Sequence, residues 1–154
     1  MILTDSISIQ ARPEEIFGVF EDMDQHYRQW HPDHVLFRWL SGHGVRVGHV
    51  FYFEEYIAGT LLKKKVVFTH VVPNRHSEFA PTFWLIKLFL PRMVFRIEPD
   101  ADGCRFTAEI HLRMGPLARR LQRRQLAAIR EHMRVEGVNL QRIVSLPLAT
   151  RGRS

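Results

Sequence analysis

The last third of the chain constrains the fold more than any other segment. From Pro116 to about Ser145 the residues have a helical period, and within this segment Gly137 is the only glycine and no proline follows Pro116. Most of the preceding segments alternate apolar and polar residues with a period of two, which is typical of strands. Strands followed by one terminal helix, without alternation between the two, argue for an α+β fold with an antiparallel sheet.

The first 35 residues predict a strand followed by two short helices. Residues 2–10 alternate as a strand does, and Pro13 with two glutamates after it marks the start of a helix. A second short helix is expected over 22–29 and ends before Pro32, because the residue before a proline is pushed out of helical geometry. Later strands are expected over 35–40, 48–57, 60–72, 75–80, 92–98 and 104–114.

Two details complete the predicted architecture. The pair Asp102-Gly103 is a strong signal for a hairpin turn, whereas the apolar segment 81–91 does not distinguish a helix from a strand. We therefore predict a curved antiparallel sheet wrapped around the long C-terminal helix. It forms a single domain over 1–146, and a basic tail over 147–154 is expected to be flexible.

The composition is that of a globular protein of 154 residues, a common size for one domain. The single cysteine, Cys104, excludes an internal disulfide and suits a reducing compartment. The N-terminus lacks the pattern of a signal peptide. The longest apolar run, Phe83–Leu90, is shorter than a membrane span and contains Lys87. We expect a soluble, cytoplasmic protein without a membrane partner.

The net charge of +6 raises the question of nucleic-acid binding. An arginine-rich helix can bind phosphate, but the same pattern is more typical of the solvated face of an amphipathic helix. No zinc-finger, helix-turn-helix or RNA-binding signature accompanies these charges, so nucleic acid is not an expected partner. Much of the positive charge lies in Arg119, Arg120, Arg123, Arg124, Arg130 and Arg134.

The long helix carries polar residues on the face that should contact the sheet. At about 100° per residue, His132, Glu136 and Asn139 fall in the middle of an otherwise apolar face that also includes Leu121. Burying such groups without partners would cost several kcal/mol. The spacing i, i+4 places the histidine beside the glutamate, so the two either bind one metal ion or form a hydrogen-bonded pair that lines a wet cavity. The asparagine either orients Glu136 or is an ordinary helix-face residue.

Two other segments supply further candidate metal ligands. Segment 27–34 is rich in side chains that ligate or hydrogen-bond, and strand 48–57 carries Glu54 and Glu55, of which only one can face a pocket. His34, one of these glutamates and the pair on the helix would give two imidazoles and two carboxylates. This set suits a catalytic zinc ion, and manganese, iron or cobalt also accept carboxylate-rich sites.

The order of these features extends over nearly the whole chain. It comprises an opening strand that ends at 11–17, a loop with Trp30, the strand and turn over 48–59, the hairpin at 102–103 and the terminal helix. In this order the chain resembles the START/SRPBCC superfamily, which contains birch-allergen-like and polyketide-cyclase-like proteins. The resemblance implies the helix-grip (START/Bet v 1-like) fold and an apolar internal cavity, but no single activity.

Three short segments carry a narrower resemblance. They are Tyr27-Arg-Gln-Trp-His-Pro-Asp-His34, Glu55-Tyr-Ile-Ala-Gly59 and His132-Met-Arg-Val-Glu136. The first is similar to the Tyr-x-x-Trp-His-Pro-x-x-His segment of the 2,4-diacetylphloroglucinol hydrolase family. The other two are similar to that family's strand glutamate followed by Tyr-Ile-Gly and to its helical His-x-x-x-Glu. Members are zinc enzymes that cleave a carbon–carbon bond between an aromatic ring and an acyl group.

This resemblance implies a role for each matching residue. It implies that Tyr27 is the phenol that contacts a substrate oxygen. His31 and Glu54 are the two candidates for relaying protons. The spacing from proline to histidine is one residue shorter than in the family, so either His31 or His34 reaches the metal ion. The implied metal ligands are His34, Glu55, His132 and Glu136.

The leading functional hypothesis is therefore a zinc-dependent hydrolase that acts on a small acylphenol or polyketide-like ketone, with carbon–carbon bond hydrolysis as the reaction. Two alternatives on the same fold stay open: a metal-free carrier of hydrophobic ligands or lipids, and a metal-free cyclase. All three place a small aromatic or polyketide-like ligand in an internal cavity. A homodimer also stays open, because related proteins often dimerise.

Overall fold

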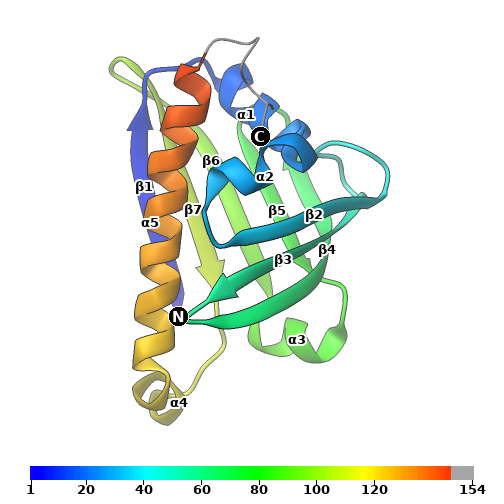
Figure 1. The fold of residues 1–154 in the computed structure, drawn as a ribbon, viewed down its shortest axis with the longest axis vertical. Coiled ribbons are helices and arrows are strands. Elements are labelled where there is room, and N and C mark those ends of the chain that lie inside the picture. The colour runs from blue at the N-terminus through cyan, green and yellow to red at the C-terminus, as the bar shows by residue number, and fades with distance from the viewer. Residues whose placement is uncertain (147–154) are drawn as a thin grey trace.

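The computed structural model describes residues 1–146, so the expected basic tail over 147–154 lies outside the described residues. Seven antiparallel strands form one curved sheet in the order β1-β7-β6-β5-β4-β3-β2, and a long helix runs along its concave side (Figure 1). The α+β helix-grip class predicted from the sequence is confirmed. The strands are β1 (Ile2–Ile9), β2 (His34–Ser41), β3 (Val50–Ile57), β4 (Thr60–Val72), β5 (His76–Pro81), β6 (Arg92–Asp100) and β7 (Gly103–His111).

Two short helices follow β1, as expected, and they close one end of the curved sheet (Figure 1). Helix α1 (Pro13–Glu21) begins at a proline. Its missing N–H costs nothing, because N–H groups in the first turn of a helix have no partner within the helix, and Glu14 and Glu15 lie in the same turn. Helix α2 (Met23–Trp30) follows at once and buries Tyr27 and Trp30. Its end leads directly into β2.

Hairpin turns fix the register of the central strands. Asp100 pairs with Gly103, so the predicted hairpin forms, but Ala101 and Asp102 connect its strands and Gly103 already belongs to β7. Ile57 pairs with Thr60, so Ala58 and Gly59 alone connect β3 to β4. Both turn residues have positive φ, 49° and 77°, which matches the twist of a two-residue hairpin. This register places Phe51, Phe53, Glu55 and Ile57 of β3 on the buried face.

The C-terminal helical region is interrupted once, contrary to the single helix that the sequence predicts. Helix α4 (Pro116–Leu121) ends at Gln122, whose φ of −101° and ψ of 19° leave helical geometry, and α5 (Arg123–Ser145) follows. The break changes the direction of α4. Leu121, expected on the face toward the sheet, is therefore 77% exposed.

Helix α5 packs closely on β1. A Cβ on Gly137 would lie 3.3 Å from Asp5 Oδ2 and 3.4 Å from Ile7 Cγ2, so glycine permits this approach. The core fills the space between α5, α1 and the concave face of the sheet, where Leu140 and Val66 are fully buried. None of the helices in residues 1–146 combines the length and apolar character that a membrane crossing needs.

The apolar segment whose type the sequence left undecided forms a short helix, α3 (Trp84–Phe89). It connects β5 to β6 and lies at the same end of the molecule as α4, opposite α1 (Figure 1). No residue of α3 is buried, which is unusual for a helix that is almost entirely apolar.

Candidate metal centre

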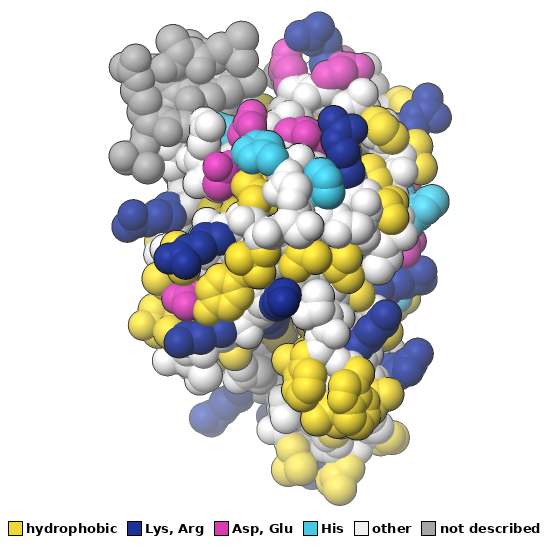
Figure 2. Space-filling view, turned by 90° about the vertical axis from the view of Figure 1, so that its right-hand side faces the viewer, with side chains coloured by type: hydrophobic (Ala, Val, Ile, Leu, Met, Phe, Trp, Pro, Cys, Tyr) yellow, Lys and Arg dark blue, Asp and Glu magenta, His cyan; other side chains and the backbone are white. Residues whose placement is uncertain are grey.

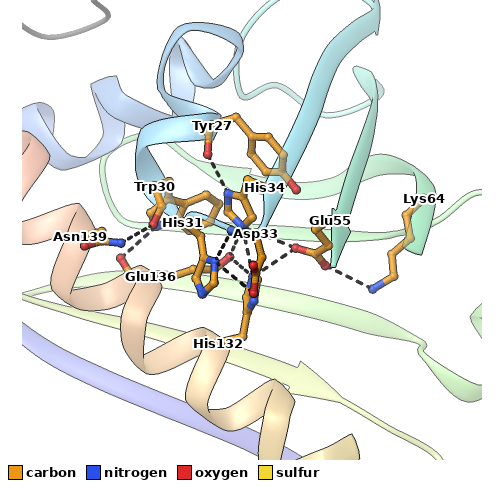
Figure 3. A network of polar contacts seen from close by, with 10 residues as sticks. All are labelled: Tyr27, Trp30, His31, Asp33, His34, Glu55, Lys64, His132, Glu136 and Asn139. Carbon is orange, nitrogen blue, oxygen red and sulfur yellow. Dashed lines mark hydrogen bonds and ion pairs between the residues drawn. The ribbon is translucent and has the colours of Figure 1, made fainter. Parts of the chain in front are cut away.

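Four side chains converge between α5, β3 and the start of β2 (Figure 3). Each of His34, Glu55, His132 and Glu136 offers one ligand atom, and these atoms all lie within 4.8 Å of one another. The structure therefore brings together all four residues that the resemblance implies as metal ligands. We refer to them as the four-ligand cluster.

The local structure explains how residues so far apart in sequence meet. His34 is the first residue of β2 and pairs across the sheet with Glu55 of β3. His132 and Glu136 are one turn apart on α5, and their side chains contact each other at 3.2 Å. The cluster thus joins the edge of the sheet to the middle of the long helix.

The distances inside the cluster are short. His34 Nε2 lies 2.9 Å from Glu136 Oε1 and 3.1 Å from His132 Nε2. Glu55 Oε2 lies 3.3 Å from His132 Nε2 and 3.5 Å from His34 Nε2. Four ligands held about 2.0–2.2 Å from one ion at tetrahedral angles lie roughly 3.3–3.6 Å from each other. The cluster needs only small adjustments to reach that spacing, so these residues fit a zinc-type ion.

Two alternatives left open by the sequence are resolved in geometric terms. Glu55, and not Glu54, faces the cluster; Glu54 lies on the other face of β3, where it accepts a hydrogen bond of 2.6 Å from the Tyr52 hydroxyl. His34 contacts His132 and Glu136 of the cluster, whereas His31 belongs to a second group with Asp33 and His132. Glu54 is therefore not placed to relay protons at this site.

The surrounding polar groups orient the cluster. The Tyr27 carbonyl oxygen lies 2.7 Å from His34 Nδ1 and accepts a hydrogen bond from it when that nitrogen carries the proton, which leaves Nε2 free as a ligand. Trp30 donates its indole N–H to the carbonyl oxygen of Glu136, at 3.0 Å. Asn139 donates to the Trp30 carbonyl, also at 3.0 Å, so it positions the Trp30 backbone rather than the Glu136 carboxylate.

The electrostatics of the cluster are those of a site that attracts positive charge. Burial disfavours a charged His132, but hydrogen bonds and charges from Glu136 and Glu55 outweigh it and raise the His132 pKa to about 9. Burial likewise raises the pKa of Glu136, and the two histidines outweigh it and hold that pKa below its usual range. Lys64 lies 3.8 Å from the other oxygen of Glu55. The carboxylates of Glu55 and Glu136 thus stabilise one positive charge. Either a protonated His132 or a metal cation can supply that charge.

Tyr27 lies beside the cluster with its ring stacked on His34, at a centroid distance of 3.9 Å. Its hydroxyl is buried and has no hydrogen-bond partner among residues 1–146. Burial, followed by the negative charges of Glu55 and Glu136, raises its pKa, so the phenol stays protonated. A buried donor without an acceptor is costly, and a ligand oxygen would satisfy it.

His31 stacks on His132 at a centroid distance of 3.7 Å. Its Nδ1 accepts a hydrogen bond of 2.9 Å from the backbone N–H of Asp33. Burial, followed by the charges of His132 and His34, lowers its pKa. The ring is therefore neutral at pH 7 and carries its proton on Nε2, which makes it a hydrogen-bond donor.

An apolar pocket extends from the four-ligand cluster into the molecule. It has a volume of about 170 Å³, and Tyr27, Glu55, His132 and Glu136 are among the residues that line it. Most of its wall is aromatic or aliphatic, including Phe51, Phe53, Phe68, Phe79 and Phe95. An apolar cavity with a few convergent polar groups at one place is typical of a site for a small, mostly apolar ligand.

Sequence reasoning missed two members of the site. Lys64 lies five residues beyond the β3–β4 turn, and only the register of that hairpin brings it to Glu55. Trp30 is predicted in a loop, but it is the last residue of α2, and its hydrogen bond to α5 has no signal in the sequence. The other candidates, Tyr27 and His31, both lie where they can contact a molecule bound at the cluster.

Comparisons with known structures agree on the fold. A protein from Thermus thermophilus, TTHA0849, has a TM-score of 0.75 at 13% identity, over 94% of this chain and 97% of that chain. The ginseng (Panax ginseng) major latex-like protein 151 has a TM-score of 0.70 at 12% identity, over 96% and 98%. One di-domain ARO/CYC protein, BexL from the BE-7585A biosynthetic pathway, has a TM-score of 0.71 at 13% identity, over 96% of this chain and 50% of that chain.

Comparison with protein families is more specific than these distant structural matches. No curated protein matches the chain in sequence. Residues 2–134, most of the chain, match the family described as "Polyketide cyclase / dehydrase and lipid transport". The broader of the two resemblances seen in the sequence is therefore confirmed, and the chain belongs to the polyketide cyclase / dehydrase and lipid transport family.

Proposed function

We propose that this protein is a metal-dependent enzyme that acts on a small aromatic or polyketide-like ketone, with hydrolysis of the carbon–carbon bond beside the carbonyl as the reaction. The observation that carries the proposal is the four-ligand cluster at the wall of an apolar pocket, with donor atoms at a spacing that suits one ion. Titratable groups with shifted pKa values that gather at a pocket are typical of functional sites.

The metal ion, with zinc as the first candidate, is held by His34, Glu55, His132 and Glu136. Zinc supplies Lewis acidity, which polarises a carbonyl and lowers the pKa of water. The His34 ring is fixed by the Tyr27 carbonyl, and Glu136 lies on a helix whose backbone is tied to Trp30. These supports hold the ligands in place before the ion arrives.

Tyr27 has the strongest claim to contact the ligand. Its hydroxyl is buried beside Glu55 and lacks a partner among the described residues. We assign it the role of donating a hydrogen bond to a carbonyl or phenol oxygen of the ligand. The His31 ring, neutral and protonated on Nε2, supplies a second donor next to His132. The aromatic walls exclude water and favour a planar ring.

Metal content and activity test this proposal together. Protein purified without a nickel column is analysed by inductively coupled plasma mass spectrometry, beside a His132→Ala/Glu136→Ala variant. We expect about one zinc ion per wild-type chain and none in the variant. A screen of acylated phenols, followed by mass spectrometry of the products, should then find a hydrolysis that chelation abolishes and zinc restores. Absence of stoichiometric metal, even after zinc is added back, would refute the proposal.

A metal-free function is the second candidate, and the comparisons favour it. The family description covers polyketide cyclisation, dehydration and lipid transport, and the ginseng and BexL proteins share the fold. In this reading His132 is the cation that Glu55 and Glu136 stabilise, and the cluster is the polar side of a ligand cavity. Ligand binding or cyclisation that persists in the presence of a chelator would support it.

A further inference from the structure

The end of the molecule that carries α3 and α4 is covered by exposed apolar side chains. Trp84 and Phe89 of α3 are 64% and 65% exposed, and Leu117 and Leu121 of α4 are 71% and 77% exposed. The end of α3 is bonded to the segment that leads into α4, because the Arg113 N–H donates to the Phe89 carbonyl at 2.8 Å. We call Phe83–Phe89 together with these two leucines the apolar end. Monomeric proteins seldom leave such a patch uncovered unless something binds it.

Basic residues surround the apolar end, and acidic residues are missing from the segments that form it. Segments 82–91 and 112–124, which include α3 and α4, contain six lysines and arginines and no aspartate or glutamate. Figure 2 shows the face beside it: hydrophobic side chains gather at the lower end with Lys and Arg nearby, and the Asp and Glu side chains lie higher. The partner of this surface should be apolar in its interior and negatively charged at its boundary.

The pocket reaches the same end of the molecule. Ile57 and Leu62, on either side of the β3–β4 turn, belong to its lining, as do Leu90, directly after α3, and Leu112, shortly before α4. An apolar molecule that moves between the pocket and the apolar end therefore passes along apolar side chains.

We propose that the apolar end docks on the surface of an anionic lipid bilayer, with α3 inserted at the boundary between headgroups and acyl chains. A protein groove covers one side of a helix, whereas α3 is apolar on every side except at Lys87. Insertion into lipid removes all of these apolar sides from water at once. Tryptophan favours this boundary, and the surrounding lysines and arginines attract anionic headgroups. Docking of this kind requires no spanning helix, and it does not depend on the proposed metal site.

Vesicle co-sedimentation of the full chain tests the proposal. Vesicles of phosphatidylcholine alone are compared with vesicles that contain about one third phosphatidylglycerol. The double variant Trp84→Asp/Phe89→Asp places charges on exposed positions of α3. Val47→Asp is the matched control, because Val47 is 62% exposed but lies in the loop between β2 and β3, away from α3. Far-UV circular dichroism checks that each variant is folded.

We expect the wild type and the Val47 variant to bind the anionic vesicles, and the α3 variant to bind at least roughly tenfold more weakly. Raising the salt from about 0.1 M to about 1 M should weaken binding, because it screens the basic residues. Brominated lipids should quench part of the wild-type tryptophan emission. That quenching should be lost in Trp84→Phe.

Three outcomes would overturn the proposal. The first is that the wild type binds neither kind of vesicle. The second is that the α3 variant binds as tightly as the wild type. The third is a wild-type dimer in analytical ultracentrifugation that the α3 substitutions dissociate, without vesicle binding, which would identify a second copy of the chain as the occupant.

Discussion

His34 Nε2 lies 3.1 Å from His132 Nε2, although 98 residues separate the two histidines in sequence. One begins an edge strand and the other lies in the middle of the long helix. The two side chains meet because the end of α2 fixes where β2 begins and because α5 crosses the sheet near that point. The site therefore forms only when the whole fold has formed.

The first prediction concerns His34. His34→Ala should lower the zinc affinity by more than about a hundredfold, because replacing even an outer partner of a ligand typically costs ten- to a hundredfold. Competition titration with a chromogenic chelator measures the effect. His43→Ala is the control: His43 is paired with Asp22 on an exposed loop and should leave the affinity unchanged. Equal losses in both variants would contradict the assignment.

The second prediction uses two adjacent glutamates on β3. Glu55→Gln removes a charge that lies 3.3 Å from His132, so zinc affinity should fall by about tenfold or more. Glu54→Gln changes the same type of residue on the opposite face, where it contacts Tyr52, and should have little effect. The same titration compares them. A larger effect at Glu54 would show that the face assignment is wrong.

The third prediction separates stability from ligand binding at Tyr27. Tyr27→Phe removes a buried hydroxyl without a partner among the described residues, so the free energy of unfolding in urea should stay the same or rise by about 1 kcal/mol. Affinity for an acylated phenol, followed by quenching of tryptophan fluorescence, should fall by about five- to tenfold. Tyr52→Phe should leave this affinity unchanged. A variant that is less stable but binds normally would indicate a structural role for the Tyr27 hydroxyl.

The fourth prediction concerns acid stability at strand β7. Glu109 accepts from Arg96 at 2.6 Å and contacts His111 at 2.9 Å. Burial raises its pKa, but these partners outweigh burial and hold the pKa below 4.5. The stability that the carboxylate contributes is therefore complete above about pH 4.5 and is lost as the pH falls through the lower folded value.

Glu109→Gln should accordingly lower the free energy of unfolding by about 1–2 kcal/mol at pH 7, and the difference from wild type should shrink below pH 4.5. Urea unfolding at a series of pH values measures both. Glu98→Gln, on the neighbouring strand β6, serves as the control. A difference that grows toward acid pH would contradict the assigned direction of the shift.

Much of the fold could be predicted because local and global signals agree. The helix start at Pro13 and the hairpin at residues 100–103 are read from a few residues, and both are confirmed, although the turn lies one residue earlier than the Asp102-Gly103 pair. The segment around α3 could not be assigned, because a short apolar run suits a helix and a buried strand equally. The break at Gln122 was missed for a different reason: no glycine or proline marks it.

The sequence predicts which candidate residues lie together, and the structure brings them together, but their contacts could not be predicted in the same detail. The spacing of His132 and Glu136 is a local property of a helix, so it could be read directly. The choice between His31 and His34, by contrast, depends on where β2 begins. The unpaired hydroxyl of Tyr27 and the contact of Lys64 with Glu55 depend on packing across distant segments of the described chain, for which a single sequence carries no signal.

Strands β1 and β2 are the two ends of the strand order and do not pair with each other among the described residues. The sheet is therefore not a closed barrel, and α2 and α5 complete the wall of the pocket. If these helices move outward, the pocket widens without breaking any hydrogen bonds between strands. Ligands of different sizes should then alter amide hydrogen exchange mainly in α2 and α5, while the amides of β4 to β7 stay protected to the same extent.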